Sequence, residues 1–205
     1  MNAPKLWRGQ TLRDRSADRR EQLLDVALDL LGTDGSTAVT MRAVTRLANL
    51  SPRYFYESFD NREALLTAVY DRVETALLDR MHTTLPGADL HANVRVALEI
   101  CADYFEADPR RARILLREPL NDDTLRRHSA QRSPAFILAL APIFGADAEP
   151  LVTRGEENLA IIGTAMAGAL VALYLDWADG RLTVSRDRLV DSAVEIVLSL
   201  LNIRL

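Results

Sequence analysis

Residues 39–59, VTMRAVTRLANLSPRYFYESF, decide how the rest of the chain is organised. Their apolar residues recur at helical spacing in two short runs on either side of Asn49. Thr40 and Ser51 are residue types that cap helix N-termini, and Pro52 suits a first helical turn because its missing N–H costs nothing there. Asn tolerates a left-handed backbone, so Asn49 is able to form the bend. The segment therefore predicts a helix-turn-helix, whose second helix enters the DNA major groove.

The second predicted helix has an apolar side and a polar side. Phe55 and Phe59 lie one turn apart and are expected to pack inward. The outward side then carries four polar residues, of which the first and last are one turn apart: Arg53, Tyr54, Tyr56 and Glu57. We expect DNA bases to meet this outward side.

Three segments in fixed order carry a more specific pattern: TMR at 40–42, SPRYFYESF at 51–59 and REAL at 62–65. In order and spacing they resemble the N-terminal domain of the TetR-type (tetracycline-repressor-like) transcriptional regulators, over residues 19–66. Three positions depart from the family pattern: Asn49 replaces a usual Gly, Tyr54 a small Thr and Arg62 a Lys. Tyr54 would present a different surface to the bases.

The resemblance implies a set of DNA contacts by position in the motif: Thr40, Arg42, Ser51, Pro52, Arg53, Tyr54, Tyr56 and Arg62. Arg42 and Arg53 are able to reach guanine. Four of the other groups would mainly hold phosphates and set the register: the side chains of Thr40, Ser51 and Arg62 and the hydroxyl of Tyr56.

The resemblance also implies an all-α architecture of about nine helices. A flexible basic arm is expected at 1–17, a three-helix DNA-binding domain at 18–62, and a helical ligand-binding and dimerisation domain at 63–205. In the manner of the family, the protein would be a homodimeric repressor. A small, mostly apolar effector would release it from a palindromic double-stranded operator.

Composition and charge are compatible with this organisation. The 205 residues are 48% hydrophobic and 26% charged, which is ordinary for a soluble protein. Residues 1–62 carry a net charge of +2 and the remainder −6, as expected if only the head meets phosphate. Cys101 is the one cysteine, so no internal disulfide is possible, and no secretory signal is visible. We therefore expect a cytoplasmic protein.

The N-terminal segment leaves two interpretations open. Its basic residues would either follow DNA phosphates or belong to a solubilising terminus, and the acidic residues among them favour the second. Asp18 and Glu21 have the spacing of a capping box, which predicts that the first helix starts there. Gly32 and Gly35 are expected to end that helix.

In the body, a predicted helix at 62–82 continues from the head and connects the two parts mechanically. Further helices are expected at 90–107, from Asp108 to Pro119, and at 125–144. Aromatic and apolar residues on these and the next helix predict a ligand pocket, although plain core packing would use the same residue types. The predicted lining is Tyr104, Phe105, Phe136, Leu140, Met166 and Tyr174.

Residues 158–175 form an uncharged run, NLAIIGTAMAGALVALYL. Its length is marginal for a membrane span, but its many Ala and Gly residues favour a buried helix of a soluble protein. Ser185 is expected to cap the last helix, whose apolar residues cover most of its circumference. These two helices predict an intermolecular bundle, with a central helix of a monomer as the alternative. The predicted interface is Gly163, Ala167, Val194, Val197 and Leu201.

No arrangement in the sequence favours an enzyme. The three histidines lack the spacing of metal ligands, and Cys101 lies on an apolar helical face. We expect no cofactor, no metal and no membrane partner. Two other classes remain as alternatives: a helical-bundle enzyme, and a helix-turn-helix used only for protein contact. Steep salt dependence of binding would distinguish DNA contact from an apolar protein contact.

Overall fold

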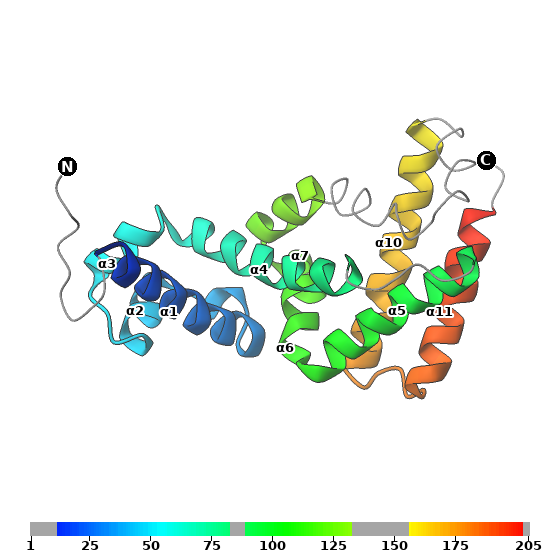
Figure 1. Ribbon diagram of the computed structural model, residues 1–205, viewed down its shortest axis with the longest axis horizontal. Helices are drawn as coiled ribbons and strands as arrows, with labels where there is room; N and C mark the ends of the chain where they lie inside the picture. The colour runs from blue at the N-terminus through cyan, green and yellow to red at the C-terminus, as the bar shows by residue number, and fades with distance from the viewer. Residues whose placement is uncertain (1–11, 83–88, 133–155, 203–205) are drawn as a thin grey trace.

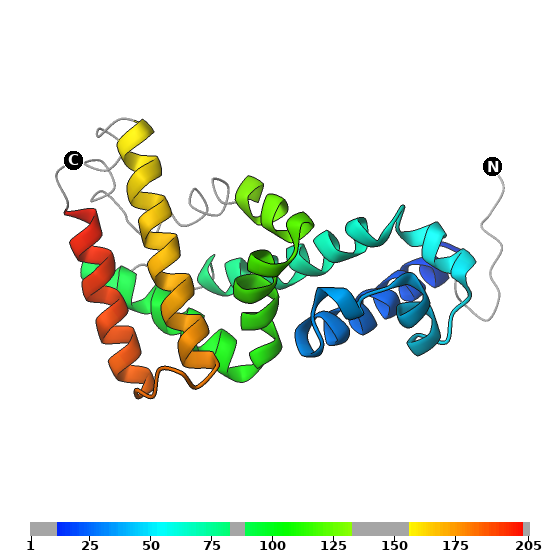
Figure 2. The ribbon, with the colours of Figure 1, turned by 180° about the vertical axis from the view of Figure 1, so that it is seen from behind.

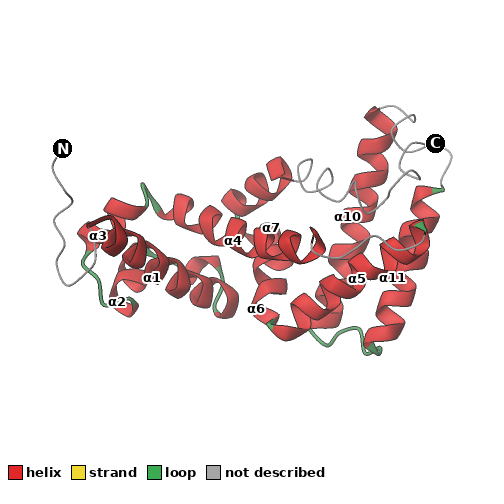
Figure 3. Ribbon diagram, viewed as in Figure 1, coloured by secondary structure: helices red, strands yellow, loops and turns green. Residues whose placement is uncertain are grey.

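The computed structural model describes residues 12–82, 89–132 and 156–202. Within these ranges the chain forms helices joined by short turns, and no strand occurs (Figure 3). The all-α prediction is confirmed. The molecule is elongated, with α1, α2 and α3 at one end and the C-terminal helices α10 and α11 at the other (Figure 1).

The head consists of α1 (Leu12–Thr33), a 3-10 turn (Ser36–Ala38), α2 (Met41–Leu47) and α3 (Pro52–Ser58). Thr40 caps α2, because its side chain accepts a hydrogen bond from the N–H of Ala43 at 3.1 Å. Asn49 has a φ of 52°, the predicted left-handed bend. Pro52 opens α3 as predicted.

The predicted start of the first helix at Asp18 is wrong, because α1 already begins at Leu12. Residues 12–17 contain neither Pro nor Gly, so nothing in the backbone stops the helix at the capping-box pattern. The part of the predicted basic arm from 12 onward therefore belongs to α1. Residues 1–11 lie outside the described residues.

Helix α4 (Arg62–His82) runs from the head into the body at the predicted bounds, and the side chain of Asn61 caps it by accepting from the N–H of Ala64 at 2.7 Å. It is followed by α5 (Leu90–Ala107) and α6 (Pro109–Ala112). A π-helical turn (Arg113–Arg117) leads into α7 (Glu118–Asn121), and residues 123–132 are again helical. Pro119 was expected to stop a helix, but it lies in the first turn of α7, where its missing N–H is tolerated.

The C-terminal helices are α10 (Glu156–Ala178) and α11 (Arg186–Leu201), which lie side by side at the far end of the body (Figure 2). Ser185 caps α11 as predicted, accepting from the N–H of Arg188 at 3.2 Å. One face of α11 packs against α5, and the residues on this face are buried within the protomer. Its buried residues are Leu189, Val190, Ala193, Val194, Val197 and Leu201.

This packing corrects the predicted interface. Val194, Val197 and Leu201 are buried inside the single chain, so they are not available to a second copy in this structure. The prediction failed because a helix that is apolar on most sides does not reveal from sequence which side faces its own core. Ala167 is exposed on α10 and Gly163 is half-buried there.

One described helix, α10, contains a stretch that is long and apolar enough to cross a membrane by length and composition, Ile161–Ala178. Only 17% of this stretch is buried within the protomer, although the sequence predicted a buried helix. Among the described residues, most of this apolar stretch is thus left uncovered, and exposed apolar patches of this kind often mark interaction sites.

Candidate nucleic-acid interface

Helix α3 presents the two sides that the sequence predicts. Phe55 and Phe59 are buried, with their ring centroids 6.0 Å apart. On the opposite side the Arg53 side chain is 83% exposed and Tyr56 is 61% exposed. The apolar side fixes how α3 sits on the head, and the polar side is thereby turned outward. Such an exposed polar face on a short supported helix is suited to contact base edges.

The turn before α3 is held by both preceding helices. Val44 and Thr45 of α2 are buried, and the Thr45 hydroxyl donates to the carbonyl of Met41 at 2.8 Å. From α1, Gln22 Nε2 donates to the carbonyl of Ala48 at 2.8 Å. Ala48 ends α2, so this bond satisfies a carbonyl that the helix leaves unpaired. Sequence reasoning missed Gln22, because a Gln on a helix surface carries no signal of a partner 26 residues away.

Helix α1 also contacts α3 through two arginines that were not predicted. The Arg19 guanidinium carbon lies 4.3 Å from the centroid of the Tyr54 ring, and that of Arg20 lies 4.6 Å from the Phe59 ring. Arg19 Nη2 is 3.8 Å from an oxygen of Glu57. The pair of neighbouring basic residues just before the apolar face of α1 was the one signal available in the sequence.

The predicted DNA contacts on α2 and α3 are mostly exposed in the head. Six are exposed: Thr40, Arg42, Ser51, Pro52, Arg53 and Tyr56. Tyr54 is half-buried, with the Arg19 guanidinium over its ring. Thr40 and Ser51 occupy the N-cap positions of α2 and α3, and helix N-termini attract phosphate.

Arg62 has a different environment from the one predicted. Its Nε donates to the carbonyl of Val39 at 2.7 Å, and its Nη2 donates to the carbonyl of Ser36 at 2.5 Å. The same Nη2 lies 3.5 Å from a carboxylate oxygen of Asp122 in the body. The guanidinium is therefore engaged between head and body, and these bonds compete with a phosphate contact.

The corner after α1 is attached to the body by a buried carboxylate. Glu118 is only 3% exposed, and its Oε2 accepts from the backbone N–H of Ser36 at 2.8 Å. Arg113 Nε donates to the other oxygen of Glu118 at 3.1 Å, and Arg113 Nη1 donates to the carbonyl of Thr33 at 2.6 Å. Buried carboxylates are rare unless paired. Head and body are thus joined by charge-assisted hydrogen bonds as well as by α4.

A family comparison identifies the head. Residues 23–69 match the model of bacterial regulatory proteins of the tetR family. These residues, which cover α2, α3, the C-terminal half of α1 and the start of α4, therefore carry the DNA-binding head of the TetR type. It is 37% identical, over 39% of its length and 41% of the relative's, to an uncharacterised HTH-type transcriptional regulator in the dhlA 5′ region of Xanthobacter autotrophicus. It is 28% identical, over 69% of its length and 60% of the relative's, to the HTH-type transcriptional regulator AlkX of Mycobacterium tuberculosis.

A solved structure extends the similarity of fold from the head to the body of the chain. The transcriptional regulator FadR from Bacillus subtilis, in complex with stearoyl-CoA, superposes with a TM-score of 0.70. The superposition covers 87% of this chain and 97% of that one, at 14% sequence identity. At this identity the similarity shows the fold alone, including a head of helix-turn-helix type and a helical body.

Three of the predicted ligand-lining residues form a packed cluster in the body. The rings of Tyr104 and Tyr174 each lie 5.8 Å from that of Phe105 in edge-on geometry, and all three side chains are buried. The Tyr104 hydroxyl donates to the carbonyl of Val73 at 2.8 Å, and that of Tyr174 to the carbonyl of Leu98 at 2.7 Å. Burial raises the pKa of both phenols, which therefore stay protonated. In this state the cluster is core.

The remaining predicted lining residues give less information. Met166 is half-buried against this core, and Phe136 and Leu140 lie outside the described residues.

Desolvation raises the pKa of the Cys101 thiol to about 12, so this cysteine is protonated and unsuited to act as a nucleophile. Among the described residues no cluster of three or more His, Cys, Asp or Glu side chains is placed to hold a metal ion.

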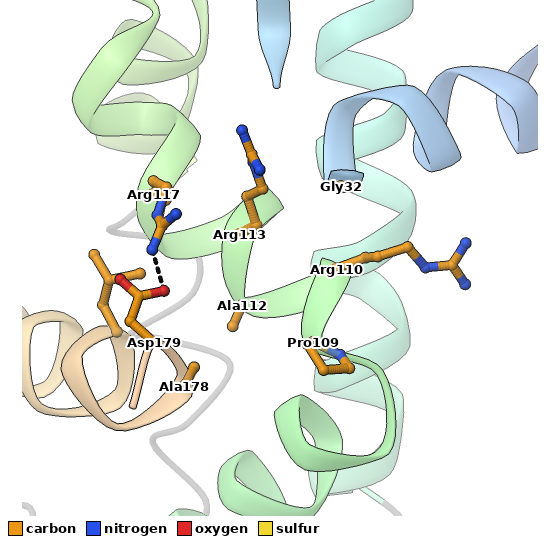
Figure 4. Close-up of a pocket in the computed structure, with 9 residues that line it drawn as sticks. Gly32, Pro109, Arg110, Ala112, Arg113, Arg117, Ala178 and Asp179 are labelled. Atoms are coloured by element: carbon orange, nitrogen blue, oxygen red, sulfur yellow. Dashed lines mark ion pairs between the residues drawn. The ribbon is translucent and has the colours of Figure 1, made fainter. Parts of the chain in front are cut away.

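A cavity of about 200 Å³ lies where α1, α6, the π-helical turn and α10 meet (Figure 4). Its lining is Gly32, Pro109, Arg110, Ala112, Arg113, Arg117, Leu175, Ala178 and Asp179. Arg117 forms an ion pair with Asp179 at one side, whereas the Arg110 guanidinium is directed away toward Asp29 and Asp108 (Figure 4). Of the predicted ligand-lining residues, the four that the structure describes (Tyr104, Phe105, Met166 and Tyr174) do not line this cavity, which is smaller than a typical ligand pocket.

Proposed function

We propose that this TetR-type regulator is a homodimer that represses transcription by placing two copies of α3 in successive major grooves of a palindromic operator. The observation that carries the proposal is the exposed polar face of α3, held on the head by buried Phe55 and Phe59. Bases of the two half-sites would lie about 34–36 Å apart, one turn of the duplex. Repression follows if such a complex covers promoter DNA.

Within each head, contacts would divide between reading and positioning. Arg53 and Arg42 are exposed and carry the planar fork that matches guanine O6 and N7. Thr40, Ser51 and the Tyr56 hydroxyl would bind phosphates, because all three residues are exposed. We leave Arg62 out of this set, since the carbonyls of Val39 and Ser36 already occupy its guanidinium.

The dimer would form through α10. Its exposed residues include Ile161, Ala165, Gly168 and Ala172, which recur at i, i+4, i+7 and i+11 and therefore share one face. Among the described residues, an added Cβ at Gly168 would meet nothing within 4 Å, which leaves room for a partner helix to approach closely. A two-fold axis along this face would pair α10 and α11 of both copies in a four-helix bundle.

A small, mostly apolar effector would control DNA binding. The proposal rests on the aromatic body and on the fold shared with FadR of Bacillus subtilis, whose structure contains stearoyl-CoA. An effector that binds better to one arrangement of the two heads shifts the population toward it. The body is connected to each head by α4 and by the Glu118 contacts. A movement of α7 would therefore shift Ser36, whose N–H donates to Glu118. Such a regulator would act in the cytoplasm, where the chromosome lies.

The direct test of DNA recognition is selection of duplexes from a random pool by the full chain. The proposal predicts enrichment of a two-fold symmetric sequence, bound by two chains, with half-site centres about one helical turn or a small multiple apart. Enrichment of no sequence at low ionic strength would refute it. Enrichment of a single unsymmetric site bound by one chain would refute the dimer.

The effector is tested on the selected duplex. Stearoyl-CoA and the free fatty acid are titrated into the protein–DNA complex, with coenzyme A alone as the control. Release by the acylated compound but not by coenzyme A would support an apolar effector. If neither these nor a panel of other apolar compounds weakens binding, the protein is a ligand-independent regulator.

A further inference from the structure

Glu57 lies between two guanidinium groups that come from different helices. Its Oε1 accepts from Arg53 Nε at 2.8 Å within α3, and its Oε2 lies 3.8 Å from Nη2 of Arg19 in α1. Each oxygen of the carboxylate thus faces its own arginine. This arrangement differs from an isolated ion pair one turn apart, because Arg19 of α1 also attracts the Glu57 carboxylate and restricts its rotation.

Arg19 is itself held in place. Its guanidinium carbon lies 4.3 Å from the centroid of the Tyr54 ring, and its side chain is only 25% exposed. Stacking on an aromatic face and pairing with a carboxylate both favour one orientation of a planar guanidinium. α1, Tyr54 and Glu57 are therefore linked in one chain of contacts that ends at Arg53.

The contact with Glu57 leaves a defined part of Arg53 available. Glu57 engages Nε, while the Arg53 side chain as a whole remains 83% exposed. The two terminal nitrogens, Nη1 and Nη2, are the pair of donors that an end-on approach to guanine O6 and N7 requires. An arginine fixed in this way loses less conformational freedom on binding than one that rotates in solvent.

Without such a role, the Glu57 carboxylate on the outward face of α3 would contribute little to stability and would weaken DNA binding. Exposed ion pairs one turn apart contribute little to stability. Close to DNA, a negative charge is repelled by every phosphate and so opposes binding to any sequence. A group that weakens binding to all duplexes but aids binding to one increases specificity.

We propose that Glu57 is a positioning residue for sequence recognition: supported by Arg19, it aims the terminal nitrogens of Arg53 at one guanine while its charge weakens binding to other sequences. The proposal rests on DNA binding by α3 and deepens it by naming what sets its specificity. It predicts effects of opposite sign on specific and non-specific DNA, which a purely structural role of Glu57 would not produce.

The test compares Glu57→Ala with the wild-type chain on three duplexes at one salt concentration. These are the selected operator, the operator with the guanine pair that Arg53→Ala identifies replaced, and a scrambled sequence. E57A should bind the scrambled duplex about two- to fivefold more tightly, and its discrimination at that guanine should fall about tenfold. Glu63→Ala is the matched control, because Glu63 is exposed at the start of α4, directly after the head, and pairs with Arg62 instead of Arg53. It should leave the discrimination unchanged.

Glu57→Gln separates charge from geometry, since the amide oxygen is still able to accept from Arg53 Nε. It should gain the same affinity for scrambled DNA as E57A but keep more of the discrimination. In the Arg53→Ala background, E57A should cause no further loss at the guanine. Unchanged discrimination in E57A, or a changed preference only at another base pair, would overturn the proposal. Failure of the wild-type chain to select any sequence would instead refute the proposed function.

Discussion

Arg53 and Arg62 lie nine positions apart in the same head, yet their surroundings give them different roles. Arg53 extends from α3 with one carboxylate partner and is otherwise in solvent. Arg62 is only 30% exposed and donates to two backbone carbonyls. Guanidinium groups that satisfy carbonyls inside a protein stabilise its fold, and those that remain in solvent are available to a ligand.

Replacing Arg53 by Ala should weaken binding to the selected operator by roughly 1–3 kcal/mol and relax the preference at one base pair. The loss follows from removing a bidentate guanine contact. Fluorescence anisotropy with the operator and its single-base variants measures both effects. Unchanged affinity and base preference in this variant would show that Arg53 does not read sequence.

Replacing Arg62 by Ala should lower the free energy of unfolding by about 1–3 kcal/mol, because two carbonyls lose a charged donor. Denaturant unfolding without DNA measures this loss. The salt dependence of non-specific DNA binding should stay the same, since no phosphate contact is removed. Arg42→Ala is the control, with unchanged stability and a salt slope smaller by about one. A reduced slope in the Arg62 variant would restore the predicted phosphate contact.

At this scale the sequence predicts helix faces well, caps in part and partners poorly. Ser51 occupies the N-cap position of α3 as predicted, but its side chain makes no capping hydrogen bond. Thr40, Asn49 and Ser185 have the predicted conformations because their signals are local. The acceptors of Arg62 are 23 and 26 residues away, and those of Arg113 include a carbonyl 80 residues away. No periodicity encodes such pairs.

At the scale of elements, the contact between α1 and α6 positions the head on the body. Gly32 lies in α1 directly against Arg110 of α6. A Cβ added at Gly32 would lie 2.4 Å from the Cβ and 3.2 Å from the Cα of Arg110. A side-chain rotation does not relieve such a clash, because these atoms move only with the backbone of α6. The sequence suggested Gly32 only as an end of the first helix.

Gly32→Ala should therefore force α6 away from α1 and destabilise the chain by about 1–3 kcal/mol. Thermal unfolding of this variant and of the wild-type chain gives the comparison. Equal or greater stability of the Gly32 variant would contradict the close packing of these two helices.

The bounds of most elements could be predicted, and the errors have identifiable causes. α4 and α5 match their predicted ranges because long apolar faces and clear start signals bracket them. α1 starts earlier than its capping-box pattern because that pattern also occurs inside helices. The π-helical turn before Pro119 has no counterpart in a simple helical period.

At the scale of the whole molecule, the elongated shape places the proposed DNA-contacting helix and the proposed dimer helices at opposite ends. α3 lies at one end and α10 with α11 at the other (Figure 1). The body-end helices would set how far apart two heads lie in a dimer. The sequence predicted that α10 and α11 pair with a copy, but it assigned core residues of α11 to the interface, because one chain cannot show which apolar face its own core uses.

Ala172→Glu should convert the proposed dimer to a monomer, because it buries an unpaired charge between two copies of α10. Ala172 is exposed in the protomer, so the fold of the single chain should persist. Sedimentation velocity measures the mass, and circular dichroism confirms the helices. Ala17→Glu, on the exposed side of α1, is the control and should leave the mass unchanged. A monomeric wild-type chain would rule out the dimer directly.

The affinity of the full chain for its selected duplex and for a scrambled one, measured across a series of salt concentrations, tests the central claim most directly. The account predicts that both affinities fall linearly on a log–log plot, while the selected duplex stays at least about a thousandfold preferred. Equal affinity for the two duplexes, or binding that salt does not weaken, would contradict recognition of DNA by α3.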